Sequence, residues 1–332
     1  MMMAVLIAGG LLLLFAGGEF LVRGSVGVAR RLGMSELLIG LTLVGFGTST
    51  PELVTSLQAL ADGAVGISVG NVLGSNVANV LLVIGMACLI SPIVTNPKAL
   101  GRDGFVMLAA TLLFLGLLAT DNFTRLTGLV MIGLLAAYLT TTVILDRRSG
   151  SAVAALHAEE AETVETHGPL WLSLVMALGG IAGVVFGAKF LVAGGSELAR
   201  TVGISETVIG LSIVAVGTSL PELVTSVMSA LKGKPDVALG NVIGSNIFNI
   251  LGIMGVSAAV YPFRLVPSGG EGGASLVSGQ DMIALALSAG LLILFAYTGR
   301  RLARGEGIVL LLGYAIYMAV SFNLFPQIGG PA

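Results

Sequence analysis

A unit that carries two motifs occurs twice in this chain of 332 residues. The segment GTSTPELVTS at 47–56 returns as GTSLPELVTS at 217–226, and GNVLGSN at 70–76 returns as GNVIGSN at 240–246. Both motifs therefore recur at one offset of 170 residues. A period this long is incompatible with a solenoid, whose repeats are at most about 50 residues. The duplication predicts a fold of two related halves.

The repeated unit is apolar, and so is most of the chain. Hydrophobic residues make up 55% of the sequence and charged residues only 10%, whereas a soluble domain carries about 25% charged residues. Apolar runs of about 18 residues or more recur along nearly the whole length, which predicts an all-α polytopic membrane protein. The first run lacks the basic segment of a signal peptide, so we expect it to be a membrane helix. We expect ten transmembrane helices, at residues 3–22, 37–60, 65–90, 104–119, 126–145, 170–194, 207–231, 237–261, 281–298 and 307–324.

These helices form two five-helix repeats, residues 1–145 and 170–332, joined by a polar linker at 146–169. The duplicated units lie at 36–85 and 206–255, where an ungapped alignment gives 24 identities in 50 positions. Because five is an odd number, the second repeat must enter the membrane in the opposite orientation to the first. Inverted repeats with binding between them are a transporter architecture.

The positive charges predict which side each loop faces. Cytoplasmic loops carry an excess of Lys and Arg. With the N-terminus outside, 12 of the 16 Lys and Arg residues fall in inside loops, three fall in outside loops, and Lys189 lies within a helix. We therefore expect both termini outside and the 146–169 linker in the cytoplasm.

The first motif places hard oxygen donors in the middle of a membrane helix. Pro51 has no N–H and clashes with the carbonyl four residues earlier, so it breaks the helix near Gly47 and frees carbonyl groups. Thr48 and Ser49 add hydroxyl oxygens, and Glu52 adds a carboxylate. Such oxygen donors suit Na⁺, K⁺, Ca²⁺ or Mg²⁺ rather than soft metals. The second copy supplies the same residue types in Thr218, Ser219, Pro221 and Glu222.

The second motif lies in the next predicted helix. We expect Gly74 to thin or loosen this helix, and Ser75 and Asn79 lie four residues apart, hence on one face. Two broken helices from each half would then enclose a polar cavity at the membrane centre. The second copy of the motif contains Gly244, Ser245 and Asn249.

A purely structural interpretation competes with an ion site. Pro in a membrane helix commonly makes a kink that Ser and Thr hydroxyls repair, and Asn side chains can join helices. The two glutamates favour an ion site or pathway, because a carboxylate at the bilayer centre costs roughly 3 kcal/mol or more. Glu19 and Lys189 are repeat-equivalent, and we expect them to extend toward opposite membrane surfaces.

Other function classes lack their signals. No nucleophile–base pair, phosphate-binding loop or dinucleotide fingerprint occurs, so we expect no enzyme and no cofactor beyond transported ions. No basic patch indicates nucleic acid, and no obligatory protein partner is evident. Cys88 is the only cysteine, so no intramolecular disulfide can form.

At the two repeated motifs the chain resembles the Ca²⁺/cation antiporter superfamily, and within it the prokaryotic sodium/calcium exchanger-like branch. The resemblance implies a Ca²⁺/Na⁺ exchanger of the prokaryotic inner membrane, with four ion positions between the repeats. It also implies that the first and sixth helices, with Gly pairs at 17–18 and 179–180, slide across the two halves that carry the site.

The resemblance also implies a role for each motif residue. Glu52 and Glu222 would be the carboxylates shared by Ca²⁺ and Na⁺, with Thr48 and Thr218 beside them. Asn79 and Asn249 would line the middle position. The flanking Na⁺ positions would use four serines and two backbone carbonyls, those of Ser49, Ser75, Ser219, Ser245, Gly45 and Ala215.

One position departs from the family pattern. Many sodium/calcium exchangers carry Asp where this chain has Asn249, and potassium-dependent exchangers tend to carry Asp at both middle positions. The site then holds two formal negative charges, those of Glu52 and Glu222. One Ca²⁺ neutralises them, whereas three Na⁺ would leave a charge of +1. This makes potassium dependence less expected and leaves the Na⁺ stoichiometry open.

Three alternatives stay open at this point. A Ca²⁺/H⁺ antiporter would use the same buried carboxylates as proton carriers. An uncoupled cation channel would conduct without a counter-ion, although a doubled inverted site argues against it. A structural or enzymatic membrane protein is disfavoured by the lack of other catalytic side chains. The expected partners are Ca²⁺, Na⁺ or H⁺, and the lipid bilayer.

Overall fold

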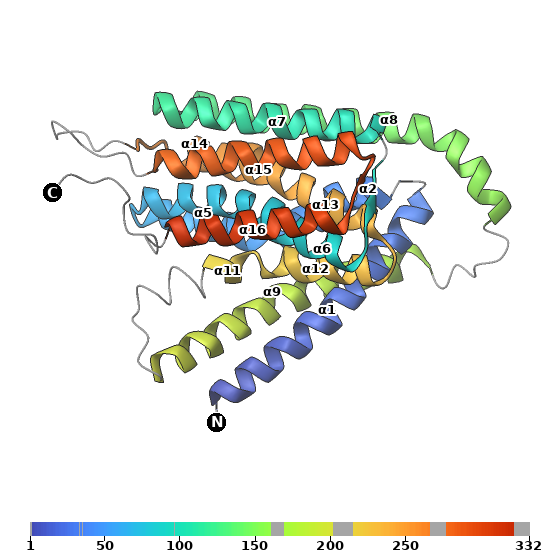
Figure 1. Cartoon of the computed structure of the whole chain (residues 1–332), viewed down its shortest axis with the longest axis horizontal. Coiled ribbons are helices and arrows are strands. Elements are labelled where there is room, and N and C mark those ends of the chain that lie inside the picture. The colour runs from blue at the N-terminus through green and yellow to red at the C-terminus, as the bar shows by residue number, and fades with distance from the viewer. Residues whose placement is uncertain are drawn as a thin grey trace.

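The protein is a bundle of α-helices in a computed structural model that describes residues 2–32, 34, 36–95, 97–160, 169–201, 215–265 and 277–321 (Figure 1). Six helices are uninterrupted: α1 (Met2–Leu32), α7 (Pro97–Thr120), α8 (Arg125–Glu160), α9 (Leu170–Thr201), α15 (Gly279–Thr298) and α16 (Arg304–Ser321). Two others contain a π-helical segment, and they run as α5 (Val65–Ala78), η2 (Asn79–Ile84) and α6 (Gly85–Ile90), and as α13 (Pro235–Ile247), η5 (Phe248–Met254) and α14 (Gly255–Val260).

Eight of the described helical stretches are long and apolar enough to cross a membrane. Large apolar side chains cover their outer surfaces, and Leu12, Phe105 and Leu126 are each at least 70% exposed. Such surfaces suit lipid rather than water. The chain is therefore an integral membrane protein, which confirms the predicted helical class.

The two other predicted spans coincide with broken segments. The first consists of α2 (Glu36–Ile39), the π-helical η1 (Gly40–Val44), α3 (Gly45–Thr48) and α4 (Thr50–Ala61). The second is described from α11 (Ala215–Thr218) through α12 (Leu220–Leu231), and its earlier part, 202–214, lies outside the described residues. The count of ten crossings and the inverted arrangement stay predictions.

Helices α1 and α9 lie side by side, inclined to the rest of the bundle (Figure 1). Glycines bring their backbones into contact: a Cβ atom at Gly17 would lie 2.6 Å from the Val184 nitrogen, and one at Gly180 would lie 2.3 Å from the Leu21 nitrogen. Close approach through small residues is the usual way in which helices associate in lipid. One glycine of each predicted pair, Gly17 and Gly180, thus marks a tight contact between the first and sixth predicted helices.

Several predicted helix ends are wrong because hydropathy registers only the apolar part of a helix. Helix α1 continues ten residues beyond the predicted end at 22 and finishes with Arg30 and Arg31 in its last turn, where cations stabilise the carbonyl end. Helix α8 continues through Glu160, so most of the predicted 146–169 linker is helical, and 161–168 lies outside the described residues. Glu19 does not extend alone toward the surface, because it pairs with Arg23 and Lys232.

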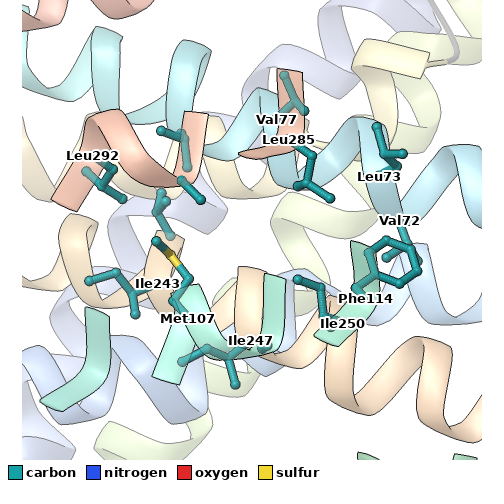
Figure 2. Close-up of a cluster of buried hydrophobic side chains, with 14 of the residues drawn as sticks. Val72, Leu73, Val77, Met107, Phe114, Ile243, Ile247, Ile250, Leu285 and Leu292 are labelled. Atoms are coloured by element: carbon teal, nitrogen blue, oxygen red, sulfur yellow. The ribbon is translucent and has the colours of Figure 1, made fainter. Parts of the chain in front are cut away.

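A single large apolar core holds the motif-bearing helices in place (Figure 2). Met107 and Phe114 of α7 and Leu285 and Leu292 of α15 pack against side chains of α5 and α13. Those side chains are Val72, Leu73, Val77, Ile243 and Ile247. Apolar residues thus surround the polar motifs.

Two short β contacts join loops at the ends of helices. Strand β1 (Ile93–Val94) pairs antiparallel with β2 (Arg301–Leu302), with Ile93 opposite Leu302. An isolated bridge joins Phe123 to Phe263, whose rings also stack at 4.6 Å. These contacts connect the loop before α7 to the loop before α16, and the loop before α8 to the loop after α14.

Candidate ion-binding site

Each copy of the first motif breaks its helix at the same residue. Helix α3 ends at Thr48, Ser49 has φ −81° and ψ 6°, and α4 begins at Thr50 with Pro51 in its first turn. In the second copy α11 ends at Thr218, Ser219 has φ −88° and ψ 4°, and Pro221 lies in the first turn of α12. The predicted break is confirmed two residues after Gly47. Pro51 cannot donate a hydrogen bond to Gly47, so the helix ladder is interrupted there.

The break places both glutamates in the first turn of a helix and away from solvent. Glu52 and Glu222 are each 0% exposed. Acidic side chains are favoured in a first helical turn because the helix dipole is positive there. The chain therefore buries two carboxylates, each at the positive end of a short helix.

The carboxylates have few hydrogen-bond donors. The Ser49 hydroxyl donates to Glu222 Oε1 at 3.0 Å. Among the described residues, Glu222 Oε2 and both oxygens of Glu52 have no hydrogen-bond partner. Unsatisfied buried charge is strongly unfavourable unless something else neutralises it. A bound cation would supply what the described donors do not.

Neutral oxygens near the motifs are unpaired in the same way. Ser219 Oγ, Asn76 Oδ1 and Asn79 Oδ1 are buried without a partner among the described residues, and so are both amide atoms of Asn249. Buried polar atoms are nearly always paired in proteins, so each exception requires a cause. A group of unpaired oxygen acceptors around two carboxylates has the chemistry of a hard-cation site.

Hydrogen bonds across the two halves bring the motifs together. Thr48 Oγ1 lies 3.2 Å from Asn241 Oδ1, and Ser245 Oγ donates to the Gly45 carbonyl at 3.2 Å. Asn79 Nδ2 donates to Asn246 Oδ1 at 3.1 Å. The site therefore lies between α3 and α4 of the first half and α12 and α13 of the second, with α5 and η2 adjoining.

The remaining predicted residues lie on the adjoining elements η5, α11 and α5. Asn249 is the second residue of η5, Thr218 is half-buried at the end of α11, and α11 begins at Ala215. Ser75 is buried in α5, but its side chain makes no hydrogen bond to the other predicted residues within the described part of the chain.

One local prediction is wrong. Helix α5 passes through Gly74 without a break, and the hydrogen-bond pattern changes only at Asn79, where η2 begins. In the second copy the change comes one residue before Asn249, where η5 begins. Single π-helical turns often occur at functional sites because they reorient side chains. The second motif therefore ends in a π-helix, and the expected loosening at Gly74 does not occur.

Two asparagines that we did not single out hold the broken helices. Asn71 Nδ2 donates to the Glu52 carbonyl at 3.2 Å and to Ser56 Oγ at 3.0 Å. Asn241 Nδ2 makes the same contacts with the Glu222 carbonyl, at 3.4 Å, and with Ser226 Oγ, at 3.0 Å. Both asparagines follow their glutamate by 19 residues, so the identical spacing in the two copies was the available signal.

The formal charge of the site comes from two side chains. Glu52 and Glu222 are the acidic residues of the two motif copies, and no group of three or more His, Cys, Asp and Glu side chains that could hold a metal occurs in the described ranges. The middle positions are the neutral Asn79 and Asn249. The arrangement combines two carboxylates with neutral oxygen donors inside a membrane bundle, which is the chemistry that suits a hard cation.

Comparison with known proteins agrees with this class. The sodium/calcium exchanger protein family model matches residues 2–144 and 172–323. Sodium/calcium exchanger MaX1 of Methanosarcina acetivorans is 36% identical over 95% of this chain and 97% of its own length, and inner membrane protein YrbG of Escherichia coli is 31% identical over 97% of each. A solved structure of the sodium-calcium exchanger NCX_Mj, soaked with Na⁺ and Ca²⁺, superposes with a TM-score of 0.80 at 32% identity and covers 97% of this chain and 98% of that one.

The fold and the site define a membrane transporter for cations, not an enzyme. The chain belongs to the sodium/calcium exchanger family.

Proposed function

We propose that the protein is a secondary active antiporter that exchanges Ca²⁺ for Na⁺ by alternating access. The observation that carries this proposal is the set of buried, unpaired oxygens on Glu52 and Glu222 between the two motif copies. Because Ca²⁺ and Na⁺ would need the same carboxylates, loading one ion releases the other. The gradient of one ion then drives transport of the other.

The proposed architecture is ten membrane helices in two inverted repeats, residues 1–145 and 170–332. The equivalent breaks at Ser49 and Ser219 support it, because each divides a predicted span into two short helices. The distribution of Lys and Arg supports both termini outside. The name of the Escherichia coli relative, inner membrane protein YrbG, supports a prokaryotic inner membrane.

The proposed ligands combine charged and neutral oxygens. Glu52 and Glu222 would bind both ions, with Thr48 and Thr218 beside them. Asn79 and Asn249 would line the middle position, where unpaired amide oxygens are already buried. Flanking Na⁺ positions would use serine hydroxyls and backbone carbonyls, those of Ser49, Ser75, Ser219, Ser245, Gly45 and Ala215.

The charge of this site favours electroneutral exchange. One Ca²⁺ or two Na⁺ balance the two carboxylates, whereas a third Na⁺ would leave an uncompensated positive charge in a buried site, which is costly. Two protons would balance the carboxylates equally well. The absence of described donors to Glu52 is compatible with a protonated carboxyl, so a Ca²⁺/H⁺ antiporter is the alternative.

Flux of ⁴⁵Ca²⁺ into proteoliposomes tests the proposal, with Na⁺, K⁺ and H⁺ gradients imposed one at a time. We expect uptake driven by an outward Na⁺ gradient at clamped pH, and no requirement for K⁺. Uptake driven only by a proton gradient would establish the alternative. Uptake that proceeds equally without a counter-ion gradient would indicate a channel and contradict antiport.

Two neutral variants test the site. Glu52→Gln and Glu222→Gln keep the side-chain volume but remove one of the two charges, so each should abolish Ca²⁺ flux. Asp281→Asn, in the first turn of α15, is the control because it removes a half-buried carboxylate outside the site. Near-normal flux in both glutamine variants would exclude the assigned carboxylates.

A further inference from the structure

The second-copy helix α12 is covered by α1, but the equivalent face of α4 is open. A Cβ atom at Gly18 of α1 would lie 3.1 Å from Val224 Cγ1 and 2.9 Å from Met228 Cγ of α12. Both side chains pack into the apolar cluster beneath α1 and α9. Their counterparts 170 residues earlier are Val54, which is 59% exposed, and Gln58, which is also exposed. This face of α12 is thus covered by α1, whereas the repeat-equivalent face of α4 is exposed.

An ion pair sits at the closed contact. Glu19 follows Gly18 in α1, and its Oε2 lies 2.5 Å from Nζ of Lys232. Lys232 caps the C-terminus of α12, one turn beyond Met228. Both side chains are partly exposed, at 30% and 22%. The pair therefore joins α1 to the end of α12 at the edge of their apolar contact.

The repeat supplies a second pair with the charges exchanged. The offset of 170 relates Glu19 to Lys189 in α9 and Lys232 to Asp62 at the end of α4. Each pair combines one acidic and one basic residue, although each residue of the second pair has the opposite charge to its repeat-equivalent in the first. Lys189 and Asp62 therefore carry the opposite charges that an equivalent ion pair would require.

In this structure the second pair is open. Asp62 is exposed and accepts hydrogen bonds from Gln58 Nε2 at 3.0 and 3.1 Å. Lys189 is exposed and lies over the Phe186 ring, with Nζ 5.8 Å from its centroid. These two described residues thus form no ion pair with each other. Asp62 caps α4 beside its uncovered face, just as Lys232 caps α12 beside its covered face.

We propose that Glu19–Lys232 and Lys189–Asp62 are alternating latches that hold the site open to one side of the membrane at a time. Because α1 and α9 touch backbone to backbone, they would move as one body. In the opposite state α9 covers Val54 and Gln58, Lys189 pairs with Asp62, and Glu19 separates from Lys232. This inference rests on the proposed alternating access, and it adds the four residues that position the moving pair.

Each of the two states would contain one of the two ion pairs, which keeps the states close in free energy. A partly exposed ion pair contributes up to about 1 kcal/mol, or about five-fold in an equilibrium. A single latch would bias the protein toward one state by that factor, and the second latch offsets the bias. Removing one latch should shift the population toward the other state by up to about five-fold.

Cross-linking tests whether the second pair meets. Cys88 is the only cysteine and is buried, so Cys88→Ala provides a cysteine-free parent. Lys189→Cys with Asp62→Cys is the test pair, and Glu19→Cys with Lys232→Cys is the matched control. We expect both pairs to form disulfides, with their yields changing in opposite directions as Na⁺, Ca²⁺ and ion-free buffers are exchanged. A 62–189 pair that never cross-links, while 19–232 does, would overturn the latch.

Charge exchange gives a second, functional measurement. Lys189→Asp and Asp62→Lys should each slow Ca²⁺ turnover by up to about five-fold, and the double variant should recover it. A merely structural role in the present state predicts no recovery, because the two side chains do not touch there. Equal loss in the double variant would overturn the proposal. Failure of the unmodified protein to exchange Ca²⁺ would refute the proposed function instead, since cross-linking is read without transport.

Discussion

Replacing Ser49 by Ala should destabilise the ion-free protein, whereas Ser219→Ala should not. The two serines are repeat-equivalent and buried. Ser49 lies at the break before α4, and Ser219 lies at the equivalent break before α12. Only Ser49 has a carboxylate partner, Glu222 Oε1 at 3.0 Å, and Ser219 Oγ is unpaired among the described residues. The pair of variants therefore isolates one hydrogen bond in an almost unchanged sequence context.

The size of the effect follows from the kind of bond. A hydrogen bond to a charged group contributes about 1.5–3 kcal/mol, and Ser49→Ala would remove the hydroxyl that donates to Glu222 Oε1 at 3.0 Å. Unfolding entropy of about 2.1 cal/mol/K per residue, over 332 residues, gives about 0.7 kcal/mol/K. The Ser49→Ala variant should thus lower Tm by about 2–4 °C. Removing the unpaired Ser219 hydroxyl should change Tm by less than about 1 °C, because no bond is lost.

Thermal unfolding in detergent, in buffer free of Na⁺ and Ca²⁺, measures this difference. Saturating Ca²⁺ should stabilise both variants, since a ligand that binds only the folded state raises Tm. Equal shifts for the two variants in ion-free buffer, or no shift for Ser49→Ala, would show that the Ser49–Glu222 bond does not stabilise the site.

Two further changes test the charge and the moving helices. In the parent, Ca²⁺ flux should be insensitive to a membrane potential set by K⁺ and valinomycin. Asn249→Asp adds a third carboxylate, so Ca²⁺ flux in this variant should depend on that potential. An unchanged voltage response would contradict the two-charge argument. Gly17→Leu places side-chain atoms where even a Cβ lies 2.6 Å from the Val184 nitrogen, and should separate α1 from α9, lower Tm and abolish transport. Gly9→Leu is the control, because a Cβ there meets nothing within 4 Å, and equal damage from both would show that α1–α9 contact is not the cause.

The membrane class and the helix breaks could be predicted because their causes are local. Apolar length decides whether a segment can cross the bilayer, and the missing N–H of Pro51 interrupts the ladder wherever the helix packs. The ends of α1 and α8 could not be predicted in this way, because polar residues such as Arg30 and Arg31 can extend a helix beyond its apolar part. The π-helical turns at Asn79 and before Asn249 have no sequence signal of comparable strength.

The sequence by itself determined that the chain crosses a membrane, that it contains one motif pair twice, and that two glutamates carry the formal charge of the motifs. Only the tertiary structure decided which oxygens pair and which remain free. Ser49 and Ser219 share the same neighbours in sequence, yet only Ser49 reaches a glutamate of the other half. Likewise Val54 is exposed where Val224 is covered. Nearly identical segments acquire different environments because α1 packs on α12 and not on the equivalent face of α4, and that asymmetry arises from helix packing over long sequence separations rather than from either segment alone.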